Sequence, residues 1–502
     1  MPVRPFSVGS LLFVLATLMA MLAAGGVAAA AKDAAKIEPP EAADETAPEV
    51  TPRVDLEPKP PAPPPAPPPA SDLEASPLPG PTETVGMADR LYVRTPGDEV
   101  VLFPGGRVQV DGAGFPRQSP KSGVYLRRAR VELSGWLGRI FYFDVAADFV
   151  PSPEDANAVA PSALSATDDY VSLVPFGNRL ILQAGQFDAP FTLENRTSDN
   201  YTTFIERSMV ARSLGVPRNK EVGVMAHGLL GDGVFYYSAG VFNGNGPGFR
   251  NFDNQPDAIG RLVVYPFAVR EGMFRRLEVG GSGWFGRHVL GPAFPLQATP
   301  GGYPFLMPRW VTGQPASTLE LLENGYVTAF GGELTLPFGN RFGIRGEGVY
   351  KQQKLGEVDA APSVGPITPL GNATLKGFAA YADAWFWLAG DDRMLPVPGL
   401  QLPQRLDRRY RRSFEDGLQL AVRGEILKED LISDQPTLGN PTRATTRVIS
   451  GTAGVNYWRG AFARISLNYV INMWSGTSET IKALRAQGML EHEVLVRFAT
   501  AL

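Results

Sequence analysis

The stretch YLRRARVELSG, residues 125–135, alternates between apolar and charged side chains. In an extended chain these side chains fall on two faces, with Ala129, Val131 and Leu133 on one and Arg128, Arg130 and Glu132 on the other. Alternation with a period of two is typical of a β-strand that has one apolar and one polar face. The stretch therefore predicts a strand whose two faces meet different surroundings.

The same alternation recurs along the rest of the chain. Further examples are IFYFDVAADFV at 140–150, GLQLAVRGEIL at 417–427, AFARISLNYVI at 461–471 and EHEVLVRFATAL at 491–502. In a soluble sandwich the apolar faces would pack on each other. In a membrane barrel the apolar face meets lipid and the polar face lines the lumen.

Three features favour the membrane barrel. The polar faces carry charges of both signs, and the turn PFGNR occurs at 175–179 and 337–341, whereas long polar inserts such as 391–416 separate other strands. Short turns at one end and long loops at the other are typical of outer-membrane barrels. Aromatic residues near strand ends predict an interfacial girdle: Trp136, Trp284, Trp385, Trp387, Tyr457, Trp458 and Trp474.

The length of this region sets the size of the barrel. About 415 residues, at roughly 26 per strand and connection, predict about 16 strands, within the range of such barrels. The predicted fold is an all-β, transmembrane antiparallel β-barrel with long extracellular loops. A barrel of this width can enclose a water-filled channel.

Two segments of different amino-acid composition precede the barrel region. Residues 1–31, with Arg4 followed by an apolar run and small residues, predict a secretory signal peptide, with a membrane-anchoring helix as the alternative. Residues 32–86 are rich in proline and predict a disordered periplasmic linker that extends as a spacer. We therefore assign residues 87–502 to the barrel domain.

The amino-acid composition limits the kinds of functional site that this chain can have. The 502 residues carry a net charge of -4, no cysteine and three histidines, His227, His288 and His492. Disulfides, thiolate-bound metals and a histidine-rich metal site are therefore not expected, and nothing in the net charge favours nucleic acid. No G-x-S-x-G elbow, phosphate-binding loop or Ser–His pair suggests an enzyme such as a barrel phospholipase. We expect no catalytic residue, no cofactor and no metal.

The barrel region resembles the phosphate-selective porin O/P family of Gram-negative outer membranes. The residues that carry the resemblance are YLRRARVELSGWLG at 125–138, FYFDVAADF at 141–149, DDYVSLVPFGNRLILQAGQFDAPFTLE at 168–194, FIERS at 204–208, YSAGVFNGNG at 237–246, FAAYADAWFWLAGDD at 378–392, GLQLAVRGEIL at 417–427 and AGVNYWRGAFARISLNYVI at 453–471. The resemblance implies a trimeric, 16-stranded porin whose third extracellular loop folds into the pore. It also implies a ladder of arginines that conducts phosphate.

Eight arginines are candidates for the anion path. The resemblance places Arg128 and Arg130 on the lumen wall, and Arg196, Arg207 and Arg212 on the loop after GQFDAPF. Strand parity adds Arg345, Arg423 and Arg464. Only Lys220 could serve as a constriction lysine, and acidic residues share the lumen faces: Glu132, Asp144, Asp148, Glu347, Asp383 and Glu425. Each arginine could therefore form a lumen salt bridge instead, for example Arg423 with Glu425 or Arg345 with Glu347.

These features predict an outer-membrane porin for passive diffusion of small anions, phosphate first, exported by its signal peptide. The alternatives are a weakly selective diffusion porin and a structural envelope barrel with a plugged lumen. The expected partners are small anions, outer-membrane lipids, two further copies in a homotrimer and the cell wall through the linker. The basic stretch 404–417 would collect anions at the mouth, bind lipopolysaccharide phosphates, or be a solvated charge run.

Overall fold

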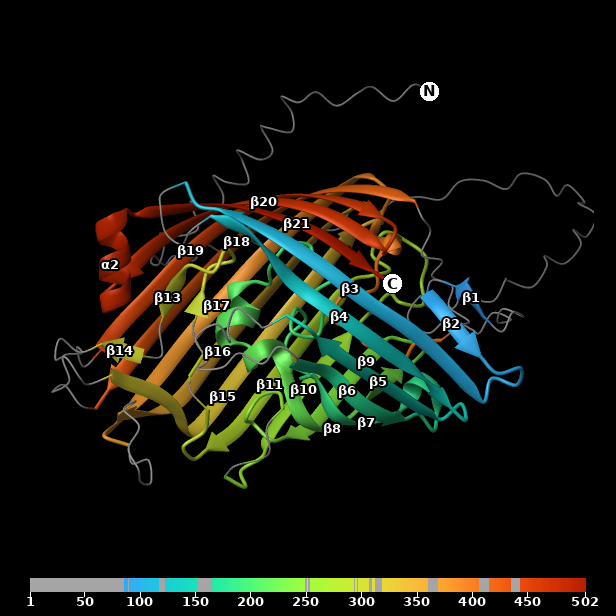
Figure 1. The fold of residues 1–502 in the computed structure, drawn as a ribbon, viewed down its shortest axis with the longest axis horizontal. Helices are drawn as coiled ribbons and strands as arrows, with labels where there is room; N and C mark the ends of the chain where they lie inside the picture. The colour runs from blue at the N-terminus through green and yellow to red at the C-terminus, as the bar shows by residue number, and fades with distance from the viewer. Residues whose placement is uncertain are drawn as a thin grey trace, which may run out of the picture. The chain divides into compact units, whose positions relative to one another are not determined.

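In the computed structural model (Figure 1), the residues described are 85–88, 90–116, 122–150, 165–248, 251, 253–292, 294–295, 297–306, 309–311, 318–359, 369–405, 415–434 and 443–502. All of them belong to one compact unit, residues 68–502. The signal peptide at 1–31 and nearly all of the linker at 32–86 lie outside the described residues, so these two domain boundaries stay predictions.

Sixteen antiparallel strands of the described chain form a closed ring. The main sheet has nineteen strands, of which three attach to the ring without being part of it. The ring strands are β3 (Val100–Gly114), β4 (Gly123–Leu137), β5 (Phe141–Asp148), β6 (Ser165–Leu173), β7 (Ile181–Asp188), β8 (Lys220–Leu230), β9 (Phe235–Phe242), β10 (Asp257–Val264), β11 (Glu278–His288), β15 (Thr318–Phe338), β16 (Phe342–Asp359), β17 (Gly371–Ala389), β18 (Asp416–Ser433), β19 (Arg443–Arg459), β20 (Ala463–Gly476) and β21 (Leu490–Ala501).

Closure comes from the first and last strands. β21 pairs with β3 from Val494 opposite Gly114 to Ala501 opposite Arg107. The attached strands are β1 (Val85–Ala88), β2 (Arg90–Arg94) and β14 (Arg309–Val311). A closed ring leaves no edge strand with unpaired backbone groups, which is the condition for a sheet in lipid. The predicted all-β barrel of about 16 strands is confirmed.

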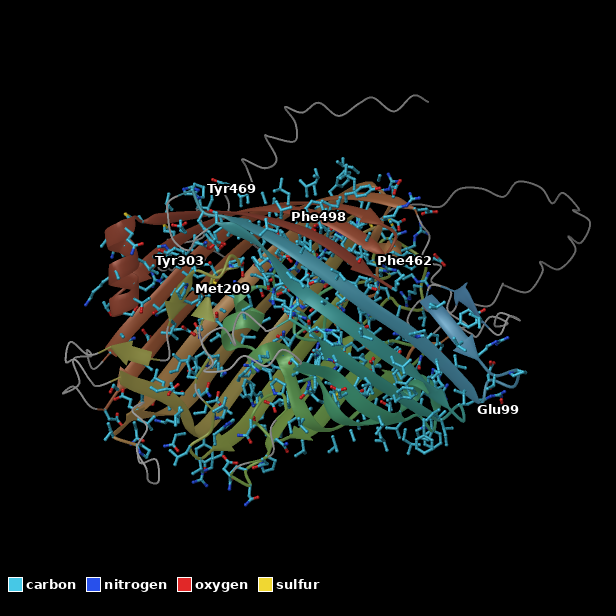
Figure 2. The ribbon with its side chains drawn as sticks, viewed as in Figure 1. Glu99, Met209, Tyr303, Phe462, Tyr469 and Phe498 are labelled. Carbon is cyan, nitrogen blue, oxygen red and sulfur yellow. The ribbon has the colours of Figure 1, made fainter. Side chains whose placement is uncertain are left out.

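The two faces of each strand differ as the alternation predicts. In β17, Phe378 and Phe386 are exposed, whereas Asp383 between them is buried. Tyr469 and Phe498, labelled in Figure 2, belong to the same exposed apolar face. The apolar face is therefore the outer surface of the ring, and the polar face points inward.

The predicted girdle of tryptophans is wrong for six residues. All six are buried inside the ring: Trp136, Trp284, Trp385, Trp387, Trp458 and Trp474. Several of their indole N–H groups find acceptors there, as Trp284 does on Asp257 at 2.8 Å. Tyr457 is exposed as predicted, and the other exposed aromatics include Phe141, Phe235, Phe338, Phe342 and Tyr350.

The two ends of the ring differ in their connections. Residues 138–140, 231–234, 339–341 and 460–462 form short connections at one end, which we call the tight-turn end. Both PFGNR turns lie there, as expected. The connection 390–415 also lies at the tight-turn end, because it follows β17 and β17 begins at the opposite, long-loop end. The expectation that this insert belongs with the long loops is therefore wrong.

Short elements complete the described part. They are α2 (Glu479–Gln487) between β20 and β21, the hairpin β12 (Gln297–Ala298) with β13 (Pro304–Leu306), a π-helical turn at Val210–Leu214 and 3-10 turns at Gly177–Arg179, Pro217–Asn219 and Asp392–Met394. Within the described residues, no helix has the length and apolarity needed to cross a membrane.

Candidate functional site

Residues 189–219, which join β7 to β8, lie inside the ring; we call them the inner segment. Their partners come from strands on different sides of the ring: Arg128 on β4, Glu347 on β16, Arg423 and Glu425 on β18, Asn468 on β20 and Arg497 on β21. A short segment can reach all of these inward-facing side chains only from within the ring. The polar faces of the strands therefore hold the inner segment.

Local sequence explains why the chain turns inward here. β7 ends at Asp188, and Pro190, which has no N–H to donate to a strand ladder, follows. Asn195 then ties both ends of the inner segment together, because its Nδ2 donates to Ala189 O at 2.8 Å and to Asn219 O at 3.1 Å.

Apolar side chains of the inner segment complete its docking. Phe191, Met209, Val210 and Leu214 join one buried cluster with residues of the ring wall. Burial of such side chains removes apolar area from water and so stabilises the docked position. The FIERS motif at 204–208 lies against the wall, since Ile205 N donates to Asn468 Oδ1 at 2.8 Å.

A second segment enters from the long-loop end. In the β12–β13 hairpin, Gln297 Nε2 donates to Glu429 Oε1 at 2.8 Å and Gly301 N donates to Glu493 Oε2 at 2.9 Å. Phe305 packs near Trp474, with ring centroids 6.1 Å apart. The hairpin also contacts the inner segment, because Arg212 donates to Ala298 O.

A third segment, residues 390–405, enters from the tight-turn end. Gly399 N donates to Thr197 Oγ1 at 2.9 Å, and Gln401 Nε2 donates to Asp188 Oδ2 at 2.7 Å and to Arg196 O at 3.0 Å. Gly399 has a φ of 71°, and a Cβ there would lie 2.7 Å from a terminal nitrogen of Arg261. Glycine is therefore needed where this segment meets the inner segment.

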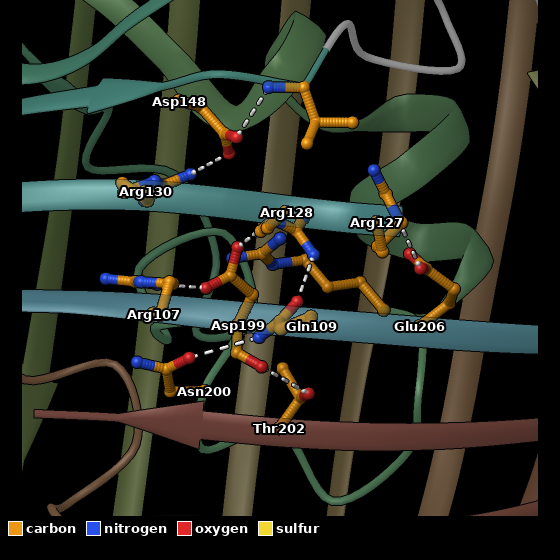
Figure 3. A network of polar contacts seen from close by, with 12 residues as sticks. Arg107, Gln109, Arg127, Arg128, Arg130, Asp148, Asp199, Asn200, Thr202 and Glu206 are labelled. Carbon is orange, nitrogen blue, oxygen red and sulfur yellow. Dashed lines mark hydrogen bonds and ion pairs between the residues drawn. The ribbon is translucent and has the colours of Figure 1, made fainter. Parts of the chain in front are cut away.

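The two arginines predicted on β4 line one part of the inner wall (Figure 3). Arg128 Nε lies 2.8 Å from Asp199 Oδ2 of the inner segment, and Arg130 Nη2 lies 3.5 Å from Asp148 Oδ2. A bulge places Arg127 inside as well, because Gln109 faces Arg128 whereas Val110 faces Leu126. Arg127 Nε lies 3.2 Å from Glu206 Oε1.

The three other strand arginines are inward but closely packed. Arg423 pairs with Asp383 at 2.7 Å and with Glu194 of the inner segment, so its partners differ from the Glu425 proposed above. Arg345 donates to Thr335 Oγ1 at 3.3 Å and lies 5.0 Å from the Trp385 ring centre.

Arg464 also points inward and is closely packed. It donates to Thr202 O and lies 5.0 Å from the ring centre of Trp458. All three arginines thus have protein partners on the inner wall.

Arg207 and Arg212 brace the backbone of the inner segment, and Arg196 ties the segment to β7 by donating to Asp188 O. Arg196 is buried and donates to Tyr236 Oη at 3.3 Å. Arg207 donates to Glu194 O at 2.9 Å and to Thr197 O at 2.7 Å, and Arg212 Nε donates to Arg207 O at 2.7 Å. These carbonyl contacts assign them a positioning role.

One group of inner charges lies together, and we call it the charged wall; its members are partly exposed apart from Arg130, which is buried. They are Arg107, Arg127, Arg128, Arg130, Glu132, Asp168, Asp199, Glu206 and Lys220. The exposed fraction of the Asp168 side chain is 24% and that of Arg128 is 11%, against 2% for Arg423. The members of the charged wall lie on β3, β4, β6, the first residue of β8 and the inner segment.

The carboxylates that the inner segment contributes to these pairs are held in their charged form. Burial alone would raise the pKa of Asp199, but Arg128 and Arg107 hold it well below its ordinary value. Burial likewise opposes ionisation of Glu206, and Arg127 and Arg497 lower its pKa. Ion pairs with arginine therefore fix the inner segment to the wall.

Several inward charges were not among the predicted site residues. Arg107 contacts Glu132 and lies 2.5 Å from Asp199, while Arg497 lies 2.7 Å from Asp111. Parity opposite the apolar residues of 491–502 already indicated Arg497 as inward. Arg127 had no such signal, because a bulge breaks the period of two.

Another inward cluster lies on the wall away from these arginines. His288 Nδ1 lies 2.9 Å from Glu323 Oε2, and its Nε2 lies 3.3 Å from Asp257 Oδ1. Arg261 pairs with Glu333 at 2.6 Å and with Glu278 at 3.1 Å. This part of the wall is acidic and almost fully buried.

Comparison with known families agrees with the geometry. Residues 105–287 match the model of the family described as phosphate-selective porin O and P. This match confirms, over that part of the chain, the resemblance seen in the sequence. No curated protein sequence matches the chain.

Solved structures of similar fold are outer-membrane proteins. In vitro folded OmpT of Vibrio cholerae is 10% identical, with 81% of this chain and 98% of that chain covered and a TM-score of 0.48. An anion-selective porin from Comamonas acidovorans is 13% identical, with 80% and 100% covered and a TM-score of 0.42. The channel DcaP of Acinetobacter baumannii is 10% identical, with 82% and 99% covered and a TM-score of 0.42.

Proposed function

We propose that this chain is an outer-membrane channel through which small anions diffuse passively along the charged wall. One observation carries the proposal: a group of partly exposed inner charges lies on adjacent strands and the inner segment, around Arg107, Arg127 and Arg128. Fixed guanidinium groups lower the cost for an anion to leave bulk water. No covalent chemistry or energy coupling is required.

The charge balance supports moderate rather than strong selectivity. Glu132, Asp168, Asp199 and Glu206 alternate with the cations of the charged wall, and Asp148 and Asp188 pair with Arg130 and Lys220 in addition. Each carboxylate offsets part of the attraction for an anion, but it also prevents a site that binds too tightly to release its ion. Phosphate is the first candidate solute, on the description of the matched family.

The remaining parts of the proposal concern assembly and location. A homotrimer in the outer membrane, export by residues 1–31 and cell-wall contact through residues 32–86 all follow from the family resemblance and the sequence. The eight arginines divide into two roles: Arg128 and Arg130 border the path, and the other six hold the inner segment and the wall in place.

A structural role is the second candidate function, because three segments enter the ring. The apolar cluster around Phe191, Trp284, Phe305, Leu427 and Trp474 fills part of the interior. A structural envelope barrel with a plugged lumen would have such a core. Purified protein in planar bilayers separates the two functions: steps of ohmic current with a preference for Cl⁻ over K⁺ support the channel, and folded protein without conductance supports the plug.

A further inference from the structure

A row of basic side chains lies on the outer surface of the ring, on four consecutive strands. We call it the basic row: Lys354 on β16, Lys376 on β17, Lys428 on β18 and Arg447 on β19. All four side chains are exposed and share the strand parity of the apolar outer face. These strands lie side by side in Figure 1.

The basic row marks the border of the apolar belt at the long-loop end. Lys354, Lys376 and Lys428 lie five residues, and Arg447 lies four residues, from the strand terminus at that end. On β17 the exposed Phe378 is the next outward residue toward the membrane centre, and on β19 it is Ile449. This height is where headgroups meet the hydrocarbon layer, and long basic side chains can reach them.

The basic row is continuous across the strands. Lys428 faces Arg447 directly in the β18–β19 pairing. Lys376 faces Asp430, which is two residues from Lys428, so the two lysines are diagonal neighbours. Like charges placed opposite each other on a sheet are destabilising unless an anion lies between them.

The nearest carboxylate is already occupied. Asp430 accepts from Arg443 at 2.8 Å and from Thr445 at 2.7 Å. Lys354 donates to Thr374 Oγ1 at 2.9 Å, which leaves its charge uncompensated. Lys376 faces Asp430 and Lys428 also acts on it electrostatically, so Arg443 and two lysines share this one carboxylate.

The opposite border of the same strands provides a contrast. Arg459, at the tight-turn end of β19, lies 2.7 Å from Asp416 of β18. A basic residue at that border thus has a carboxylate of its own, whereas the four cations of the basic row have Asp430 among them, which Arg443 already holds. Long loops mark the extracellular side of such barrels, so the basic row faces the outer leaflet.

We propose that the basic row binds the phosphate groups of a phosphorylated lipid headgroup in the outer leaflet. Several cations at one height suit a headgroup that carries more than one phosphate, because each ammonium or guanidinium can contact a different oxygen. The inference rests on the proposed outer-membrane location but not on conduction.

The test uses the full chain in detergent, with lipid retention measured by native mass spectrometry. The probe is diphosphoryl lipid A, with its dephosphorylated form as the second ligand and inorganic phosphate as a competitor. Lys428→Gln and Arg447→Gln should each lower retention about fivefold. Arg459→Gln is the matched control, since it removes the same charge from the same strand, and it should leave retention unchanged.

Three results would overturn the inference: equal retention in all variants, equal retention of the dephosphorylated lipid, or displacement of the lipid by millimolar inorganic phosphate. All of these substitutions are on the exposed outer face, and heat-dependent gel mobility checks that each variant is folded. Retention of lipid by a barrel that does not conduct would contradict the proposed function while supporting this inference, so the two fail separately.

Discussion

Arg128 Nε on β4 lies 2.8 Å from Asp199 Oδ2 of the inner segment, and Arg107 on β3 lies 2.5 Å from the other oxygen of the same carboxylate. One acidic side chain therefore joins two wall arginines to the segment that crosses the ring (Figure 3). Asp199 therefore docks the inner segment and also offsets part of the positive potential of the charged wall.

Replacement of this carboxylate should increase the preference for anions. In Asp199→Asn the charge of Arg107 and Arg128 is no longer offset, so the ratio of Cl⁻ to K⁺ permeability should rise severalfold in planar bilayers. Asp98→Asn is the control, because Asp98 pairs with Arg94 outside the ring strands and its loss removes the same charge. An unchanged ratio in Asp199→Asn would place the ion path elsewhere.

Loss of a wall arginine should have the opposite effect. Arg128→Gln and Arg130→Gln should each lower the Cl⁻ to K⁺ permeability ratio, and conductance should fall as the local anion concentration falls. Reversal potentials in a KCl gradient measure this change. If both variants keep the wild-type ratio, these arginines are structural and the alternative of a lumen ion-pair network holds.

Arg423 should matter for stability rather than selectivity. Its side chain is 2% exposed and is paired with Asp383 and Glu194. Arg423→Gln leaves two buried carboxylates without their cation, which should cost about 3–5 kcal/mol in the free energy of unfolding. Thermal unfolding in detergent checks this; Arg459→Gln, in an exposed pair, should change the midpoint little. Equal midpoints for both variants would contradict the assignment.

Docking of the inner segment should weaken in acid. The pKa values of Asp199 and Glu206 are depressed in the folded protein, by nearby arginines acting against burial. Groups with depressed pKa values stabilise the fold fully above their ordinary pKa, near 4, and lose that contribution as the pH falls toward the folded values. Protease cleavage within 189–219 should therefore be constant from pH 5 to 8 and increase below about pH 4.

A double variant provides the control for the acid effect. In Asp199→Asn/Glu206→Gln the inner segment should already be accessible at neutral pH, and its cleavage should respond less to acid. A wild-type cleavage rate that does not change down to pH 3 would contradict the role of these two carboxylates.

The third segment should restrict conductance from the tight-turn end. Replacement of residues 396–401 by a Gly-Ser linker removes the contacts of Gly399 and Gln401 with Thr197, Asp188 and Arg196. Single-channel conductance should rise, because a bound segment leaves the interior. The control replaces residues 460–462 with a Gly-Ser turn of equal length, where no inserted segment is present. Unchanged conductance in the first variant would mean that the path bypasses this segment.

Much of the fold could be predicted from alternation alone. The period of two separates Asp144 from Val145 and Arg423 from Val422, and the structure places each on the expected face. The local sequence thus decides whether a strand residue faces the inside of the ring. The partners of the inner charges are not local, since Asp199 reaches Arg107 from 92 residues away.

Physical causes also explain where the predictions from the sequence were wrong or incomplete. Tryptophan is common at membrane interfaces, but here the six indoles lie inside, where Asp257 and Asp392 accept from some of them. A bulge shifts the register at Arg127, so parity could not identify it. The insertion of residues 390–405 depends on contacts with Thr197 and Arg261 that no periodic pattern encodes.

The proposed anion path runs along the charged wall of an open barrel. The most direct test is the reversal potential of the wild-type protein in a planar bilayer across a gradient of potassium phosphate. Ohmic single-channel currents are expected, with a reversal potential displaced toward that of the anion. Folded protein that carries no current, or a reversal potential at the K⁺ value, would contradict the proposed path.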